Sequence, residues 1–531
     1  MLSDHSVRLS YLITCALVSF LVYKFIVHPG FISPLARIPA AHWSSPFCPL
    51  WSWYIKLYEL ENTTVWTLHQ TKGSIVRIGP TELSVNCYEG GIKTIYGAGF
   101  DKPDWYFNRF SNYGVDTMFT MKHSKPHAVR KRMLSHVYSK STVLASPNFR
   151  NHAKHVLFDR LLPLWSKHAD ERVPLDVYPL NFASAMDMFM GYQYGSKTGS
   201  NLIQDVEKRD SFLDNFFRPR STIFWTTEIP RINFWIERFS LKGLDNSSSV
   251  AIKAIEDWNL GLLDRAEETI LNAIQGGIED EDRPVVYETL RQKISELSLP
   301  QDKRSRLTDD KRIVVASDML DHLAAAHETS GDTLTYLFYE LSQNLELQSR
   351  LRAELLSLPN SLTFTFSVPI STVKPPDPKA LDALPMLDAI IHETLRRWPS
   401  VPGAQPRVTP SPACTLAGYK NIPAGTRVQS YAYCLHRNAD VFPDPETWRP
   451  ERWLNASPTQ LADMRRWFWA FSSGGRMCIG SNIAMFSMKH IVAALYTNFR
   501  TEIYEAGDMT QGDGFFGGPR GKKLMLKVER A

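Results

Sequence analysis

The stretch from Phe471 to Gly480, FSSGGRMCIG, constrains this chain more than any other part of its sequence. Glycines on both sides of Cys478 allow the backbone to approach a flat ligand closely. An amphipathic helix is predicted from Ile479 to Phe499, so its unpaired N–H groups and positive dipole end would favour a thiolate at Cys478. Arg476 adds a nearby cation. A single cysteine is usually a small buried side chain, but the full pattern F-x-x-G-x-R-x-C-x-G favours a functional one.

The remaining cysteines form no CxxC pair and are widely spaced: Cys15, Cys48, Cys87, Cys414 and Cys434. A disulfide framework would be denser, so cysteine staples and zinc clusters are both disfavoured. The chain has 60 Lys+Arg against 55 Asp+Glu, a net charge of +5, and no concentrated basic stripe. This charge distribution argues against a nucleic-acid partner.

The N-terminal run from Leu9 to Val27 is mostly apolar. As a helix rising about 1.5 Å per residue it would reach about 28 Å, enough to cross a bilayer core. A cleaved signal peptide is the alternative, but residues 28–31 (HPGF) offer no small-x-small cleavage site. Tyr23 and Lys24 at the far edge favour a retained anchor. The flanking charges do not settle its orientation.

Frequent prolines follow the apolar run, at positions 29, 34, 39, 46 and 49. They favour extended backbone over helix, as in a stiff tether. We therefore predict a membrane anchor over residues 1–28, a proline-rich tether over 29–50 and one catalytic domain over 51–531. No other stretch has the length of a membrane span.

The body of the chain has mainly helical periodicity. Helical patterns cover 252–274, 313–355, 381–398 and 479–499. Alternating residues at 74–79 and 82–85 predict a hairpin around Gly79-Pro80, and residues 357–380 read as a surface loop. No repeat or long linker divides the chain. The predicted fold class is mainly α with small β-sheets, in a single large domain behind an N-terminal transmembrane helix.

Two common functional motifs are incomplete, and a third is absent. Gly97-Ala98-Gly99 lacks the third glycine of a dinucleotide site, and no GK[ST] sequence occurs. His392-Glu393 begins an HExxH pattern, but the fifth residue is Arg396. The sequence therefore predicts neither nucleotide binding nor a zincin site.

Together with three further motifs, the cysteine loop resembles that of the cytochrome P450 family. Glu393 to Arg396 resembles the family's ExxR helix, and Pro450 to Trp453 resembles its PERF-like segment. Ala325 to Ser330, AAHETS, resembles the oxygen-activating part of its long central helix. The four motifs stand in family order, and the resemblance covers roughly residues 30 to 531. The hairpin IVRIGPTELSV is similar to that of filamentous-fungal members.

The resemblance implies a cytochrome P450 fold that binds heme b, with the Cys478 thiolate as axial iron ligand and O2 as co-substrate. The positions that match heme-binding residues of the family are Phe471, Arg476, Arg407, His127 and Gly480. The arginine expected four residues after His127 is Lys131, flanked by Arg130 and Arg132, and the sequence leaves open which of the three reaches the heme. A solvated basic helix face is the alternative for this cluster.

The resemblance implies that Glu328 and Thr329 deliver protons during catalysis. Thr329 can hydrogen-bond back to the carbonyl of Ala325 and open the helix locally. Ala326 replaces the usual glycine of this motif. Without the family, Glu328 reads as an exposed helix acid and Thr329 as a packing residue.

A structural role is expected for Glu393, Arg396 and Arg452, which resemble the family's buried ion network beside the heme loop. For electron supply the family implies an NADPH-cytochrome P450 reductase, and the candidate docking cations are Arg465, Arg466 and Lys489. Ordinary surface charge is the alternative for these three cations.

Residues 211–240 are rich in aromatics and would roof the substrate cavity and touch the bilayer. The interleaved arginines of this stretch are Arg218, Arg220, Arg231 and Arg238. Further expected cavity walls are Phe107 to Phe119, Val401 to Ala404, and Phe515-Phe516. This apolar lining predicts a lipophilic small-molecule substrate.

The predicted function is that of a heme-thiolate monooxygenase inserting one oxygen atom from O2 into a lipophilic molecule, in secondary-metabolite biosynthesis. The predicted location is the endoplasmic reticulum membrane, with a single-pass anchor and a cytosolic catalytic domain. The alternatives are a heme-thiolate isomerase or dehydratase, and a membrane-anchored heme carrier or sensor.

Overall fold

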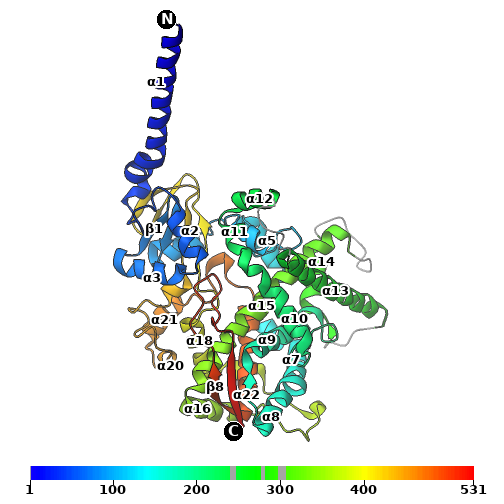
Figure 1. Cartoon of the computed structure of the whole chain (residues 1–531). Helices are drawn as coiled ribbons and strands as arrows, with labels where there is room; N and C mark the ends of the chain where they lie inside the picture. Colours follow the sequence, from blue (N-terminus) through cyan, green and yellow to red (C-terminus); the bar gives the residue numbers. More distant parts are fainter. Residues whose placement is uncertain (1, 240–246, 277–281, 297–306) are drawn as a thin grey trace.

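A long helix, α15 (Asp309–Ser342), runs through the middle of the molecule in the computed structural model, which describes residues 2–239, 247–276, 282–296 and 307–531 (Figure 1). Helix α9 (Val177–Tyr194) packs along it. A Cβ on Gly331 would lie 2.8 Å from ring atoms of Phe182, so this close approach requires glycine. The two helices form the core against which the cavity is built.

Around this pair the described residues form a mainly helical body, which confirms the predicted fold class. The helices before α9 are α1 (Leu2–Val22), η1 (Tyr23–Ile32), η2 (Pro34–Arg37), α2 (Leu50–Leu57), α3 (Glu61–Lys72), η3 (Tyr88–Gly97), α4 (Trp105–Phe110), α5 (Ser124–Leu134), α6 (Lys140–Ala145), α7 (Pro147–His155), η4 (Val156–Leu161) and α8 (Leu162–Glu171). Those between α9 and α15 are α10 (Val206–Phe217), η5 (Arg218–Thr222), α11 (Ile223–Thr227), α12 (Pro230–Arg238), α13 (Ser247–Gly276) and α14 (Val285–Glu296). Those after α15 are α16 (Leu345–Leu356), η7 (Ile370–Thr372), α17 (Pro378–Asp382), α18 (Pro385–Arg397), α19 (Ala432–Leu435), α20 (Glu451–Leu454), α21 (Pro458–Trp467), η8 (Gly474–Arg476) and α22 (Ser481–Asn498).

The strands of the described residues form three small sheets. They are β1 (Ile75–Gly79), β2 (Glu82–Val85), β3 (Leu175–Asp176), β4 (Arg407–Val408), β5 (Ala413–Leu416), β6 (Tyr419–Pro423), β7 (Arg427–Gln429), β8 (Phe499–Ala506) and β9 (Leu524–Arg530). The sheet orders are β1-β2-β7-β4, β3-β9-β8 and β5-β6. The predicted hairpin is present as antiparallel β1 and β2, and β2 pairs in parallel with β7. This sheet carries β4 to the wall of the cavity.

The predicted helix over 313–355 is instead two helices, α15 and α16. The break lies at Gln343 and Asn344, and the Asn344 side chain accepts a hydrogen bond from the Leu347 N–H at 2.9 Å. Asparagine favours such N-cap positions because its side-chain oxygen satisfies a free backbone donor. The apolar periodicity continues across the break, so it could not show the cap.

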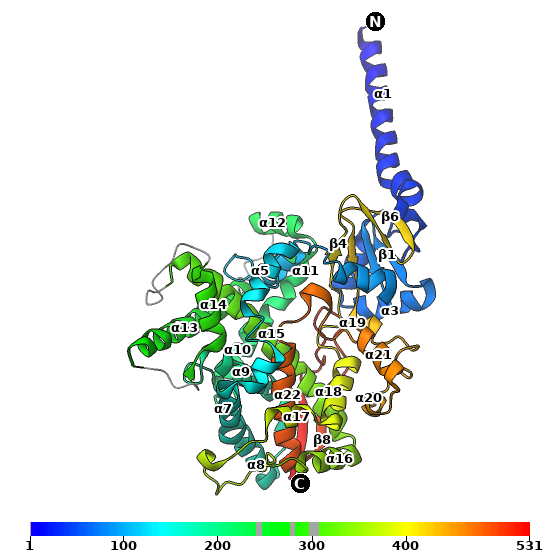
Figure 2. The same ribbon diagram turned by 180° about the vertical axis from the view of Figure 1, so that it is seen from behind.

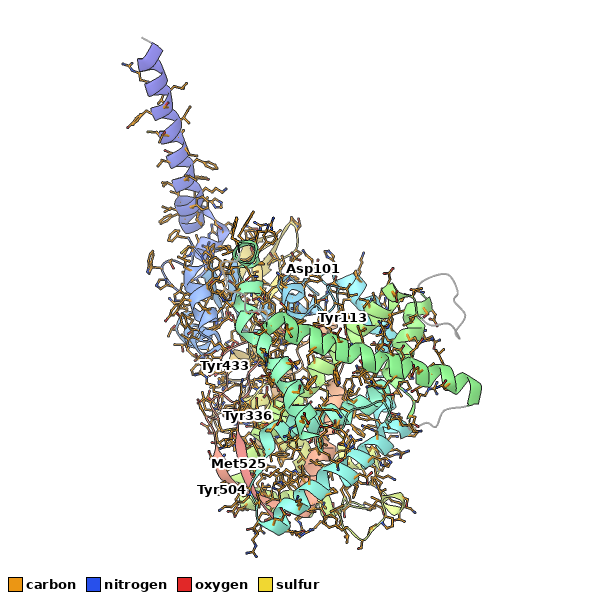
Figure 3. All side chains as sticks on the ribbon, turned by 45° about the vertical axis from the view of Figure 1, so that its right-hand side comes forward. Asp101, Tyr113, Tyr336, Tyr433, Tyr504 and Met525 are labelled. Carbon is orange, nitrogen blue, oxygen red and sulfur yellow. The ribbon has the colours of Figure 1, made fainter. Side chains whose placement is uncertain are left out.

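Helix α1 stands away from the body, and its side chains project outward (Figure 3). Among the described residues, the segment Arg8–Ile32 is the one helix long and apolar enough to cross a membrane, and none of its apolar window is buried. A signal sequence would pass the same test of length and composition. Helix α12 lies at the end of the body from which α1 emerges (Figure 2).

The proline-rich segment differs from the extended tether that the sequence predicts. Pro29 lies inside η1, which continues to Ile32. The fully buried guanidinium of Arg77 donates to the carbonyls of Pro29 at 2.8 Å and Pro80 at 2.7 Å, and Leu35 is buried. These contacts attach the segment to the first sheet.

Candidate active site

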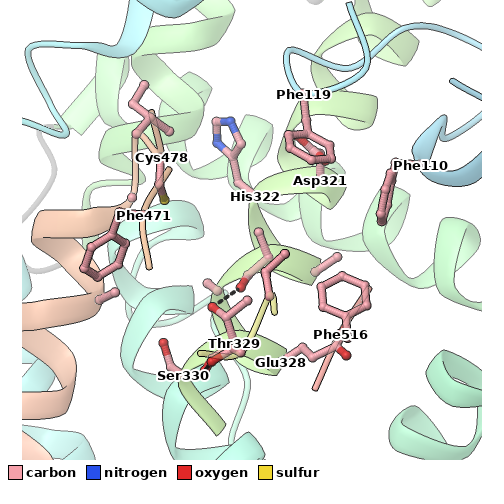
Figure 4. A pocket seen from close by; sticks show the side chains of 18 of the residues that line it. Phe110, Phe119, Asp321, His322, Glu328, Thr329, Ser330, Phe471, Cys478 and Phe516 are labelled. Atoms are coloured by element: carbon pink, nitrogen blue, oxygen red, sulfur yellow. Dashed lines mark hydrogen bonds between the residues drawn. The ribbon is translucent and has the colours of Figure 1, made fainter. Parts of the chain in front are cut away.

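A cavity of about 470 Å³ lies between α15, the cysteine loop and α4. Figure 4 shows Cys478 and Phe471 on one side, Phe110 and Phe516 on the opposite side, and Thr329 and Glu328 on α15 between them. The lining also includes β4, the start of α22 and the segment around Val401. Several expected wall segments therefore meet in one cavity.

Cys478 is a free thiol inside the protein, where it lines this cavity. Its backbone N–H donates to the carbonyl of Phe471 at 2.9 Å, which closes the loop. Burial within the protein raises the pKa of the Cys478 thiol, whereas hydrogen bonds from the Gly480 and Ser481 backbone and the charge of Lys131 act to lower it. A metal ion bound to the sulfur would favour the thiolate much more strongly, because a coordinating thiol is deprotonated outright.

The cysteine loop is fixed by close backbone packing at Gly474. This residue has φ +70°, and a Cβ there would lie 2.1 Å from the Tyr96 carbonyl oxygen. Glycine is therefore required both by the left-handed conformation and by the neighbouring chain. Behind it, Trp469 donates its indole N–H to Ser473 at 2.9 Å and its backbone N–H to His436 at 2.7 Å.

Cations gather on the cysteine side of the cavity. Arg407 is buried and donates to the Tyr106 hydroxyl at 2.9 Å. Arg476 donates to the carbonyls of Met121 at 2.7 Å and Lys122 at 3.0 Å, but its buried Nε has no partner among the described residues. Burial and the neighbouring Arg407 charge lower the pKa of Arg476 to about 10. These two guanidinium groups therefore suit an anionic ligand.

Helix α5 adds two of the predicted residues to the same wall. His127 is buried, and burial together with the charge of Arg476 lowers its pKa to about 3, so it is neutral at physiological pH. Lys131 lines the cavity and donates to the carbonyls of Gly475 at 3.2 Å and Met477 at 2.7 Å. Arg130 instead pairs with Asp318 at 3.1 Å. Within this cluster Lys131 is therefore the cation that reaches the cysteine loop.

Lys102 was missed by sequence reasoning, because no motif marks it. It is buried in the cavity wall, with its ammonium 3.7 Å from the Phe119 ring centroid. Burial and the charges of Arg407 and Arg476 lower its pKa well below the usual value. An accessible thiol, these clustered cations and the unpartnered Nε of Arg476 fit a heme, which carries an iron and two propionates.

The acid and alcohol on α15 both face the cavity. Thr329 donates its hydroxyl to the Ala325 carbonyl at 2.8 Å, as predicted. Glu328 is not an exposed helix acid: it is buried and forms an ion pair with Arg220. The sequence had placed Arg220 among interfacial arginines, and its pairing inside the cavity corrects that expectation.

Two further hydroxyls near Thr329 were not found from the sequence. Ser400 donates to the Thr329 carbonyl at 2.7 Å, and the Ser400 and Thr333 hydroxyls lie 2.8 Å apart. Thr333 also donates to the Thr329 carbonyl at 2.8 Å. The turn of α15 that carries Thr329 is thus held by Ser400, which belongs to a second segment of the chain.

The predicted ion network of Glu393, Arg396 and Arg452 is buried. The Glu393 carboxylate accepts from Arg396 at 2.8 and 2.9 Å and from Arg452 at 2.9 Å. It also accepts from the Trp453 indole N–H at 3.0 Å and the Arg449 backbone N–H at 2.9 Å. Five donors therefore surround one carboxylate.

The three expected docking cations differ in their exposure. Arg465 and Arg466 are exposed. Lys489 is buried and pairs with Asp382 at 2.9 Å and Asp388 at 2.7 Å, so it is not available to a partner. The two aspartates that pair with Lys489 lie about 100 positions earlier in the sequence, so no local pattern shows that its charge is engaged.

The aromatic stretch has an inner and an outer part. Phe216 and Arg220 line the cavity. On α12 and directly after it, Phe234, Trp235 and Phe239 are exposed, each by more than half of its surface. This outer part lies at the end of the body from which α1 emerges (Figure 1). The inner part therefore belongs to the cavity wall, as expected, while contact of the outer part with a bilayer stays a prediction.

Comparison with known proteins gives one consistent family. The sequence model described as "Cytochrome P450" matches residues 50–523. The chain is 27% identical over 517 residues to "Cytochrome P450 monooxygenase orf2" of Aspergillus niger, covering 95% of each chain. It is 27% identical to "Cytochrome P450 monooxygenase avaI" of Aspergillus versicolor, covering 78% of this chain and 92% of the relative. It is 25% identical to "Cytochrome P450 monooxygenase azaI" of Aspergillus niger, covering 86% and 94%.

Proposed function

The chain belongs to the cytochrome P450 family of monooxygenases, and from this premise we propose that it inserts one oxygen atom of O2 into a lipophilic small molecule, with electrons supplied by NADPH through a reductase. We further propose a role in the biosynthesis of a secondary metabolite. The observation that carries the proposal is the cavity itself, because Cys478, the cation cluster, Glu328 and Thr329 all line it.

The residues on the cysteine side would hold the heme. The Cys478 thiolate would bind the iron, and Arg407, Arg476 and Lys131 would neutralise the propionates, with His127 beside them. When bound, a heme with a thiolate ligand supplies oxygen activation, because the thiolate pushes electron density toward the iron and favours O–O cleavage. Phe471 and Gly480 would shape the loop around the sulfur.

The residues of α15 would handle protons on the substrate side. The Thr329 hydroxyl donates to the Ala325 carbonyl and can turn to donate to a ligand beside it. Glu328 would supply the acid, and Arg220 holds its carboxylate in place. Ser400 anchors the Thr329 carbonyl, so the alcohol is presented from a fixed turn.

We propose the domain division and location on the same basis. Residues 1–28 would anchor the protein in the endoplasmic reticulum membrane, residues 29–50 would join the anchor to the body, and residues 51–531 would form a cytosolic catalytic domain. The contacts of Arg77 with the 29–50 segment support a firmly attached joint. The exposed aromatics of α12 would rest on the same bilayer.

The test of the function is turnover of the full-length protein with reductase, NADPH and a lipophilic metabolite extract. We expect a product heavier by one oxygen atom, labelled when ¹⁸O2 is used. Conversion without NADPH would instead indicate an isomerase or dehydratase. Heme binding with no substrate-dependent NADPH use would indicate a carrier or sensor.

The ligand assignment has its own test. Cys478→Ala should abolish the reduced carbon-monoxide spectrum of thiolate-ligated heme, while Cys48→Ala, at a partly exposed cysteine outside the cavity lining, should leave it intact. A surviving spectrum in Cys478→Ala would refute the assignment.

For proton delivery, Thr329→Ala should keep NADPH consumption but release peroxide at the expense of product, and Thr329→Ser should restore coupling.

A further inference from the structure

Arg109 places a positive charge in the cavity that the proposed chemistry does not use. It belongs to α4 and lines the cavity wall. Its buried Nε has no hydrogen-bond partner among the described residues. A buried cation without a counterion is costly, so its presence in a substrate cavity calls for a ligand that compensates it.

Three carboxylates act on Arg109 through their charge, those of Glu328, Glu228 and Glu59. Glu59 is exposed and forms no ion pair with Arg109 among the described residues, and the other two are engaged elsewhere. Glu328 pairs with Arg220. Glu228 pairs with Lys56 at 3.2 Å and with Arg427 at 3.1 Å. Burial and the like charge of Arg220 lower the pKa of Arg109 to about 10, so it stays protonated at neutral pH. Among the described residues, Arg109 therefore has no ion-pair partner on this side of the cavity.

Aromatic rings surround the guanidinium and fix its position. Its central carbon lies 4.9 Å from the Phe515 ring centroid, 5.3 Å from those of Trp105 and Phe110, and 5.9 Å from that of Phe516. Cation–π contacts of this kind hold a charge without neutralising it. The planar fork of donors thus stays available for a bidentate acceptor.

The position of Arg109 relative to the cysteine defines what it can do. Phe110 and Phe516, two of the surrounding rings, lie across the cavity from Cys478 (Figure 4). The cations near the cysteine form a separate group that heme propionates would occupy. Arg109 is therefore placed to hold the end of a substrate that points away from the reacting atoms.

Resting on the proposed function, we propose that the substrate carries a carboxylate and that Arg109 binds it. The carboxylate accepts two hydrogen bonds from the guanidinium, and the lipophilic remainder extends toward Cys478. The oxidised carbon then lies far from the acid group. Arg109 is thus a residue that determines substrate class and orientation.

The test compares acids with their neutral esters on the full-length, heme-loaded protein in phospholipid nanodiscs. The probes are the straight-chain acids from octanoate to hexadecanoate and their methyl esters. Binding is read from displacement of a heme-ligating azole, followed by its Soret shift. At neutral pH we expect at least one acid to bind roughly 10- to 100-fold more tightly than its ester, as charged hydrogen bonds confer.

Arg109→Met should remove this preference while keeping ester affinity, and Arg109→Lys should retain part of it. The matched control is Arg231→Met on exposed α12, which should bind acid and ester like the wild type. Partition of probes into lipid is the same for all variants and cancels in the comparison.

Equal affinity for every acid and ester, or an acid preference that survives in Arg109→Met, overturns the assignment. So does the absence of binding by any acid of the series. These outcomes are distinct from failure of the proposed function, in which reductase and NADPH would give no ¹⁸O-labelled product, because azole displacement measures binding and needs no turnover.

Discussion

Removal of the Glu393 carboxylate is the perturbation whose cost follows most directly from the structure. The side chain is completely buried, as is its partner Arg396, and Arg452 is 4% exposed. Trp453 and the Arg449 backbone complete its five donors. Glu393→Ala would leave two buried guanidinium groups without their carboxylate.

Breaking a buried ion pair by removing one partner costs about 3–5 kcal/mol. Native domains are stabilised by only about 5–15 kcal/mol, so the loss is a large share of the total. Glu393→Gln keeps the side-chain volume but places an amide N–H₂ group against N–H donors that now bond a carboxylate oxygen. Because two donors would then face each other, we expect Glu393→Gln to be destabilising as well. The matched control is Glu451→Ala, whose partly exposed pair with Arg350 at 2.7 Å should contribute less than about 1 kcal/mol.

The assay is urea unfolding of the heme-loaded, full-length protein followed by far-ultraviolet circular dichroism, with heme content per chain measured in parallel. We expect Glu393→Ala to unfold at much lower urea and to retain little heme, and Glu451→Ala to match the wild type. A Glu393→Ala protein that holds full heme and unfolds within about 1 kcal/mol of the control would refute the reasoning.

Three further predictions concern α15. Burial raises the pKa of Asp321 to about 8. The stability that the neutral carboxyl contributes to the wild type is therefore fully present below the unfolded pKa and is lost as pH rises through 8. In urea titrations at each pH, Asp321→Asn should be more stable than the wild type above pH 8 and equally stable below pH 4. Arg220→Met should lower the free energy of unfolding by about 1–3 kcal/mol because Glu328 stays buried without its ion pair, and unchanged thermal unfolding would contradict this. Ser400→Ala should cost about 1 kcal/mol and raise peroxide release by loosening the Thr329 turn, whereas wild-type coupling would show that Ser400 does not position it.

Much of the fold was predictable from the sequence because its signals are local. The hairpin at Ile75 to Val85 and helix α22 follow from alternation and helical periodicity. The joint near Pro29 and the break before α16 were not predictable in the same way. The joint depends on a hydrogen bond from Arg77 to the carbonyl of Pro29, which lies far along the chain. At the break, the Asn344 side chain caps the new helix.

The candidate site divides along the same line. Cys478 and Arg476 lie in one short motif, so their pattern was visible. Lys102 and Ser400 belong to no motif, and only their packing brings them to the cavity. Lys489 shows the converse, since its position near the loop was correct but its burial was not foreseen.

By itself, the sequence determined the family, the candidate thiolate loop and the mainly helical class, because these depend on residues close together along the chain. Only the tertiary structure decided which charges face the cavity. Arg220 and Glu328 are 108 positions apart and form one ion pair, while Arg109 has no ion-pair partner in the part of the chain that the structure describes. Whether a charge is paired depends on which distant segments pack against it, and no local pattern records that.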